Sequence, residues 1–192
     1  MPFHLTNTQL LVTAFVVALV VIVAVAAYLE RRKSRTIALR NRFGSEYDRA
    51  VVTHGSPRQA EAKLADRETR VEALGIRDLG SPEKERFIAE WQTVQSRFVD
   101  HPKAAVTEAD DLVNSLLEAR GYPRAGFEQR AADVSVTYPL VMDNYRLAHA
   151  VAVRSGLPEA TTEELRAAMI QYRAIFDELI QAQKTSEHKS AA

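Results

Sequence analysis

The chain of 192 residues carries 25 Lys and Arg against 25 Asp and Glu, so its formal net charge is zero and no global basic field favours nucleic acid as a partner. It has no cysteine, which excludes disulfide scaffolds, thiolate metal sites and thiol nucleophiles. The length allows one membrane span and one compact domain of ordinary size.

The first predicted element is an apolar helix over residues 10–29. This stretch has no charged residue, and only Thr13 and Tyr28 carry a polar side-chain atom. As an α-helix it would be about 30 Å long, which matches the hydrocarbon core of a bilayer. Leu, Ile, Val and Phe make up most of it, and they favour insertion into lipid. We therefore predict a single-pass transmembrane helix, preceded by a short extracytoplasmic N-terminus over residues 1–9.

The residues after this stretch predict its orientation. Residues 30–42 are expected to form a basic juxtamembrane helix, because they contain no Gly or Pro. The positive-inside bias then places the N-terminus outside and the C-terminal domain in the cytoplasm, at the inner (plasma) membrane. Membrane lipid is the expected partner of residues 10–29 and of the basic flank, whose headgroup contacts would come from Arg31, Arg32, Lys33 and Arg35.

A cleaved signal peptide is the alternative interpretation of the same segment. Ala24, Val25 and Ala26 resemble a small-residue cleavage site, and cleavage there would release a periplasmic or secreted helical domain. Against this, residues 1–9 contain no Lys or Arg, and the apolar run exceeds the usual length of about 7–15 residues in a signal peptide. The sequence therefore favours a signal-anchor that stays in the membrane.

Residues 43–183 predict a helical domain of about five or six helices, so the whole chain is expected to be all-α. No strand-like alternation occurs, and Gly, Pro and capping residues separate the helical stretches. Ser56 with Gln59, and Thr161 with Glu164, have the spacing of helix-capping boxes. Gly156 is expected to end a helix, and residues 184–192 are predicted to form a disordered tail. The helical stretches lie at about 46–52, 57–74, 82–98, 103–120, 127–134, 139–154 and 162–179.

The predicted core comes from apolar residues at helical spacing. Aromatic residues stand out in two of the stretches, around Trp91 and around Tyr172. Asp110 and Asp111 are expected to face water. The expected core residues are Phe87, Trp91, Phe98, Leu112, Leu116, Tyr145, Met169, Tyr172 and Phe176.

Several segments resemble an uncharacterised bacterial family of single-pass proteins, usually labelled hypothetical, membrane or secreted. They are residues 42–49, 87–100, 109–113, 120–123, 127–133 and 145–150. The resemblance implies an N-terminal anchor followed by a helical domain. It implies no activity, and no catalytic residue can be carried over from it.

The sequence offers little for catalysis, and we predict no catalytic, cofactor-binding or metal-binding residue and no cofactor. The five histidines, His4, His54, His101, His149 and His188, include no pair at the i, i+4 spacing of a helical metal site. The best enzyme candidate is Asp143, Arg146 and His149, which could share a helix face as a base and an anion clamp. The alternative for these three residues is a solvated face with an Asp143–Arg146 ion pair.

These observations predict a membrane-tethered, non-catalytic helical module that binds an unknown protein partner and no nucleic acid. The motivation is the anchor together with a heavily charged helix over residues 57–74 and the lack of a catalytic constellation. The released periplasmic or secreted domain remains one alternative, and a hydrolase or transferase that uses the Asp143–Arg146–His149 face remains the other.

Overall fold

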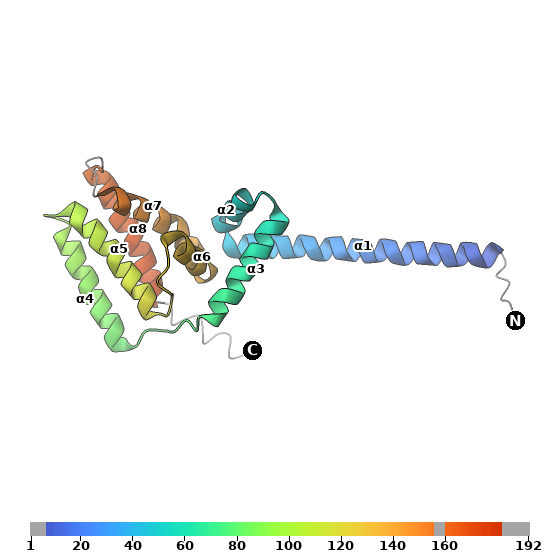
Figure 1. Ribbon diagram of the computed structural model, residues 1–192, viewed down its shortest axis with the longest axis horizontal. Coiled ribbons are helices and arrows are strands. Elements are labelled where there is room, and N and C mark those ends of the chain that lie inside the picture. Colours follow the sequence, from blue (N-terminus) through green and yellow to red (C-terminus); the bar gives the residue numbers. More distant parts are fainter. Residues whose placement is uncertain (1–6, 156–159, 182–192) are drawn as a thin grey trace. The chain divides into compact units, whose positions relative to one another are not determined.

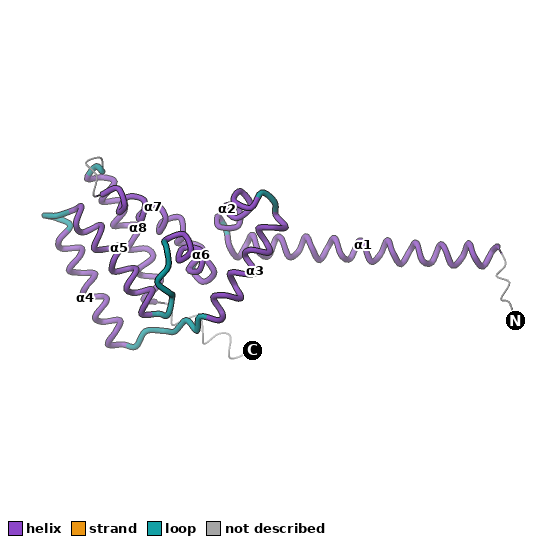
Figure 2. The backbone as a smooth tube through the Cα atoms, in the orientation of Figure 1, coloured by secondary structure: helices purple, strands orange, loops and turns teal. Residues whose placement is uncertain are grey.

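The computed structural model describes residues 7–155 and 160–181, and within them the regular elements are all helices (Figures 1 and 2). The prediction of an all-α chain is therefore confirmed. The chain divides into two compact units, residues 1–42 and 43–192. Gly156 and the tail over 184–192, both subjects of predictions above, lie outside the described residues. The helices are α1 Asn7–Phe43, α2 Ser45–His54, α3 Pro57–Ala73, α4 Ser81–Arg97, α5 Pro102–Ala119, α6 Phe127–Thr137, a 3-10 turn Pro139–Val141, α7 Met142–Ser155 and α8 Thr162–Gln181.

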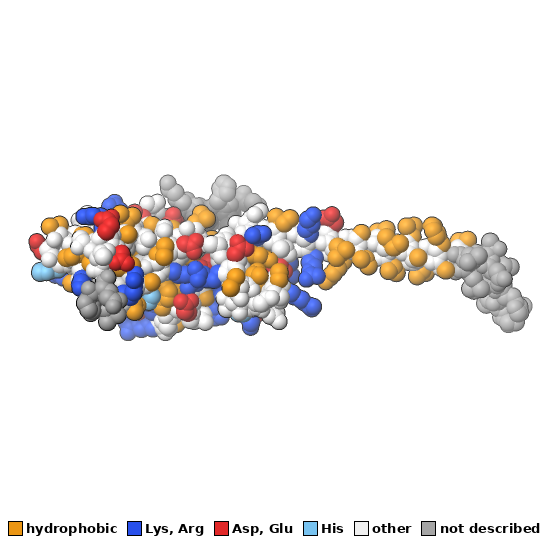
Figure 3. Space-filling view, turned by 90° about the horizontal axis from the view of Figure 1, so that it is seen from above, with side chains coloured by type: hydrophobic (Ala, Val, Ile, Leu, Met, Phe, Trp, Pro, Cys, Tyr) orange, Lys and Arg blue, Asp and Glu red, His pale blue; other side chains and the backbone are white. Residues whose placement is uncertain are grey.

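Helix α1 joins the predicted span and the basic juxtamembrane segment in one uninterrupted helix of 37 residues. At about 1.5 Å per residue it is about 55 Å long, well beyond the thickness of a bilayer core. The described apolar side chains between Val12 and Leu29 are exposed, for example Phe15 at 70% and Ile22 at 64%, whereas Phe43 at the end of α1 is buried. Hydrophobic side chains are spread along the visible face of the apolar part of α1, and charged side chains follow it (Figure 3). Residues 14–43 thus include a helical stretch that is long and apolar enough to span a membrane. The most apolar part of this stretch is not buried in the structure.

The predicted helix boundaries in the second unit rest on local signals. Gly44 separates α1 from α2 with a φ of 52°, a conformation that Gly adopts at little cost. The Ser56 hydroxyl accepts a hydrogen bond of 3.4 Å from the Gln59 backbone N–H, and Pro57 occupies the first turn of α3. At α8, Glu164 accepts from the Thr161 backbone N–H at 2.8 Å, and the Thr161 hydroxyl accepts from the Glu164 N–H. The two predicted helix starts are confirmed.

The apolar core lies among α4, α5, α7 and α8. Trp91 of α4 stacks on Phe176 of α8, with ring centroids 4.8 Å apart and an interplanar angle of 18°. Of the nine predicted core residues, eight are buried and Phe98, just beyond the end of α4, is partly buried. The described part of this unit has seven α-helices, one for each of the seven predicted stretches and more than the five or six expected for the domain; the short helices α2 and α6 both pack on α3.

The buried side chain of Arg120 fixes the end of α5. Gly121 has a φ of 102°, which fits the left-handed position after a helix. Arg120 is only 4% exposed and donates to the Leu179 carbonyl near the end of α8 at 2.6 Å and to Asp78 at 3.2 Å. This arginine therefore ties the end of α5 to α8 and to the loop before α4, a role beyond the helix stop that the sequence indicates.

Candidate functional site

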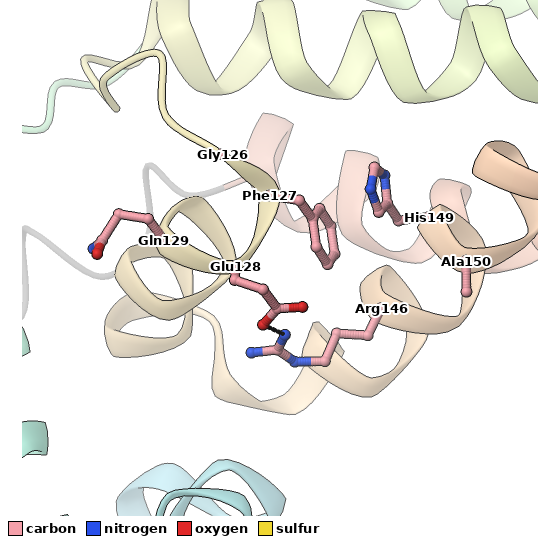
Figure 4. A pocket seen from close by; sticks show the side chains of 7 residues that line it. All are labelled: Gly126, Phe127, Glu128, Gln129, Arg146, His149 and Ala150. Atoms are coloured by element: carbon pink, nitrogen blue, oxygen red, sulfur yellow. Dashed lines mark hydrogen bonds and ion pairs between the residues drawn. The ribbon is translucent and has the colours of Figure 1, made fainter. Parts of the chain in front are cut away.

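A shallow hollow of about 500 Å³ lies between α6 and α7 and contains two of the three side chains of the sequence candidate. Arg146 and His149 reach it from α7, and Phe127 and Glu128 reach it from the start of α6 (Figure 4). Asp143 is not among its lining residues. The hollow is therefore the place to examine what these side chains can do.

Arg146 is held by two carboxylates from other helices. Its Nε and Nη2 donate to the two oxygens of Glu46 on α2 at 3.0 and 3.2 Å. Its Nη1 donates to Glu128 at 2.8 Å, a contact that Figure 4 shows. The side chain of Glu46 is 1% exposed and that of Arg146 is 11% exposed. Burial alone would lower the pKa of the Arg146 guanidinium, but the hydrogen bonds and charges of Glu46 and Glu128 outweigh it and raise that pKa. Arg146 thus links α2, α6 and α7 as a fixed cation.

The ion pair expected between Asp143 and Arg146 is not formed. Asp143 lies instead 3.9 Å from an Arg49 nitrogen, with both side chains about half exposed. Arg146 takes Glu46 because a buried carboxylate that accepts two parallel N–H groups outcompetes an exposed neighbour on the same helix. The solvated-face interpretation of Arg146 is therefore wrong, since this side chain is largely buried.

His149 pairs with an aspartate that was expected to face water. Its Nδ1 lies 3.1 Å from Asp110 on α5, and its ring stacks on Phe127 at a centroid distance of 3.7 Å. Asp110 also accepts a 2.7 Å hydrogen bond from the Tyr172 hydroxyl, and its side chain is 15% exposed. Burial would raise the pKa of Asp110, but the hydrogen bonds from His149, Tyr172 and Asn114 lower it overall. Asp110 is therefore a carboxylate inside the domain.

A hydrogen-bonded network extends from Asp110 across four helices. The Asn114 amide donates to Asp110, and its oxygen accepts from the Tyr145 hydroxyl at 3.2 Å and from Arg130. Burial raises the pKa of Tyr145 to about 12, and burial together with Asp110 raises the pKa of Tyr172. Both phenols therefore stay protonated as donors at neutral pH. The network joins α5, α6, α7 and α8 through polar contacts.

Asp143, Arg146 and His149 therefore each contact a different partner. His149 with Asp110 has the geometry of a proton-accepting pair, but the contacts described for its ring are Asp110 and Phe127, with no hydroxyl nucleophile. Among residues 7–155 and 160–181, no group of three His, Asp or Glu side chains is placed to hold a metal ion. Two of the histidines, His4 and His188, lie outside these residues.

A second hollow, which we call the Glu46 groove, lies beside Arg146 and has a volume of about 480 Å³. It is bordered by α2, α3, α6 and α7. Arg70 is fixed at its edge by the buried Asp133, to which its Nε and Nη2 donate at 2.9 and 2.5 Å. The charged lining residues are Arg49, Lys63, Arg67, Arg70 and Arg146 with Glu46, Asp66 and Glu128.

The buried Glu46 and the largely buried Asp110 are the acids that the sequence reasoning missed as partners of the candidate residues. The spacing of each acid from the buried residues of its helix indicates that it lies on the inner face. Asp110 follows Val106 by four residues and precedes Val113 by three, so it lies on the buried face of α5. Glu46 likewise precedes the buried Ala50 by four residues. An acid at a core position predicts a buried partner, although it does not tell which one.

Comparison of the chain with protein-family models, with curated proteins and with solved structures finds no match in any of the three. The resemblance to a bacterial single-pass family therefore stays a prediction. The function has to be inferred from the residues and their geometry.

Proposed function

We propose that this protein is a single-pass, membrane-tethered, non-catalytic module whose helical domain binds a protein partner on the cytoplasmic side of the plasma membrane. The observation that carries the proposal is the apolar stretch of α1, whose described side chains between Val12 and Leu29 are exposed around the helix. Exposed apolar surface of this extent is unfavourable in water, and a bilayer removes that cost. Lipid is thus the proposed environment of residues 10–29.

The orientation is proposed from the charges next to this stretch. Arg31, Arg32, Lys33 and Arg35 are all exposed and follow the apolar stretch directly, which favours a cytoplasmic position for the second unit. A cleaved signal sequence satisfies the same criteria of length and composition. Release of the domain by cleavage near Ala26 is therefore the competing outcome in the tests.

The non-catalytic role is supported by how the candidate side chains are used. Arg146 is fully engaged by Glu46 and Glu128, and the described polar contact of His149 is Asp110. These groups hold helices together, and the hollow beside them offers no second reacting group. A binding role for the outer surface of the domain fits this arrangement better than a hydrolase or transferase.

Topology can be tested cleanly because the chain has no cysteine. Single-cysteine variants Asn7→Cys and Val99→Cys, the latter at an 82% exposed position, would be treated with a membrane-impermeant maleimide. We expect Asn7→Cys to react in right-side-out spheroplasts and Val99→Cys to react only in inverted vesicles. The reverse pattern would contradict the proposed orientation. Crosslinking and purification from native membranes should recover one reproducible protein partner, and repeated failure to find one would count against the binding role.

A further inference from the structure

We propose that the Glu46 groove binds the phosphate group of a small phosphate-bearing ligand, through Arg49 and Arg67. This inference goes beyond the proposed tether and does not depend on it. The phosphate could belong to a soluble molecule or to a lipid headgroup, since both present the same oxyanion chemistry. The groove lies within the second unit.

The groove has more positive than negative side chains. Its lining holds five arginine and lysine side chains against three carboxylates, and Asp133 and Asp143 pair with two of these cations from outside the lining. Arg70 and Arg146 are satisfied, because Asp133 binds the first and Glu46 with Glu128 binds the second. Lys63 lies 3.4 Å from Asp66. Arg49 and Arg67 are the cations of the lining whose contacts with carboxylates are ion pairs without a hydrogen bond.

Arg67 is the strongest sign that something is to be bound. Its side chain is only 19% exposed, and its nearest carboxylate oxygen, on Glu46, lies 3.9 Å away, too far for a hydrogen bond. Its Nη1 is buried and has no hydrogen-bond partner in the structure. Burial lowers the pKa of the Arg67 guanidinium. The positive charges of Arg146 and Arg70 also lower this pKa, whereas the negative charge of Glu46 raises it. A largely buried guanidinium with an unsatisfied nitrogen is costly unless an anion approaches it.

Arg49 approaches the same carboxylate from the other oxygen. Its Nε lies 3.5 Å from Glu46 and its Nη2 lies 3.9 Å from Asp143, so both contacts are ion pairs without a hydrogen bond. The hydrogen-bonding capacity of Glu46 towards arginine is largely taken by the two-pronged contact with Arg146. Arg49 and Arg67 thus flank one carboxylate that does not satisfy either of them.

The chemistry of these donors selects phosphate. Two guanidinium groups offer paired N–H donors that match the oxygens of a phosphate dianion. The acidic rim residues Asp66 and Glu128 would repel an extended polyanion, and the net charge of the whole chain is zero, so a single small phosphate-bearing ligand fits better than a nucleic-acid strand. A volume of about 480 Å³ leaves room for such a ligand.

The test is calorimetric titration of the full-length protein in neutral detergent micelles with pyrophosphate, with sodium chloride added to keep ionic strength constant. We expect saturable binding that Arg67→Gln weakens at least tenfold and Arg49→Gln weakens several-fold. Arg173→Gln on α8, which removes an equal charge from a 59% exposed arginine paired with Asp177, should leave binding unchanged. Absence of saturable binding, or an equal loss in Arg173→Gln, would overturn the proposal. Arg49 is half exposed, so its variant keeps the test valid if Arg67→Gln fails to fold.

The source of the phosphate is distinguished in nanodiscs made with or without anionic phospholipid. If a headgroup occupies the groove, anionic discs should weaken pyrophosphate binding by competition in the parent protein and in Arg173→Gln. If the ligand is soluble, pyrophosphate should bind equally in both discs. Either result supports a phosphate site, whereas a failure of binding in micelles would leave the membrane tether untouched.

Discussion

Helices α1 and α8 use similar residues in opposite ways. In α8, a stripe of seven apolar residues is buried on one face, and Ile170 on the other face is 65% exposed. In α1, apolar residues occur all round, and Val16, Leu19 and Ile22 are each more than half exposed. A stripe is buried by neighbouring helices, whereas a helix that is apolar on every side needs an apolar medium. The comparison teaches that α8 is buried by other helices of the chain, whereas the exposed apolar stretch of α1 is the part for which we propose a lipid environment.

The largest expected effect comes from charge placed in α1. Val16→Arg combined with Val20→Arg should move the protein out of the membrane fraction, because each central arginine costs about 2.5–3.5 kcal/mol of insertion free energy. Sedimentation of membranes after expression measures this. The matched control is Ile170→Arg on the exposed face of α8, which should leave both membrane retention and thermal stability unchanged. Full retention of the double variant would break the comparison.

The next largest effect is expected on the stability of the domain and not on the membrane retention of α1. Phe176→Ala should lower the free energy of unfolding of the domain by about 3–5 kcal/mol, because it removes a buried ring stacked on Trp91. Membrane retention should not change. Urea denaturation in micelles, followed by Trp91 fluorescence, measures the loss. Val99→Ala, at an 82% exposed position, should stay within about 0.5 kcal/mol of the parent protein. A loss of less than about 0.5 kcal/mol in Phe176→Ala would mean that the stack does not stabilise the core.

A third prediction concerns charge, which the domain buries and residues 10–29 of α1 lack. Glu46→Gln should destabilise the domain by about 3 kcal/mol, because it leaves the guanidinium groups around Glu46 without their shared carboxylate. The same unfolding experiment applies. Glu85→Gln, an exposed change of the same chemistry on α4, should have little effect. Equal stability of the two variants would show that the buried pair contributes nothing.

The smallest effect is a dependence on pH with opposite signs at two neighbouring residues. The pKa of Asp110 is lowered in the folded protein, so its stabilising contribution is present above its unfolded pKa of about 3.9 and is lost as pH falls through the folded pKa. The pKa of Asp111 is raised by burial and by the charges of Asp110 and Glu108, so its contribution to stability grows as pH falls.

Unfolding free energies measured between pH 6 and pH 3 should therefore fall less steeply for Asp110→Asn than for the parent protein, and more steeply for Asp111→Asn. At neutral pH, Asp110→Asn should cost about 1–2 kcal/mol, since His149 and Tyr172 lose a charged acceptor. Identical pH slopes in the two variants would contradict the assigned positions of these aspartates.

The sequence predicts what is decided locally. Helix starts at Ser56 and Thr161 follow from capping residues three positions apart, and the buried stripe of α8 follows from helical periodicity. The pairing of Arg146 with Glu46 joins residues 100 positions apart, and that of His149 with Asp110 joins residues 39 positions apart. Such pairs depend on how whole helices pack, so periodicity can place an acid on the inner face without naming its partner.

The central claim is that α1 remains in the bilayer as part of the mature chain. Alkaline carbonate extraction of membranes that contain the full-length protein, followed by intact-mass measurement of the retained material, tests it most directly. We predict that the protein stays in the pellet and keeps the whole of residues 10–29. Recovery in the aqueous fraction, or a mass that begins near Ala27, would contradict the membrane tether.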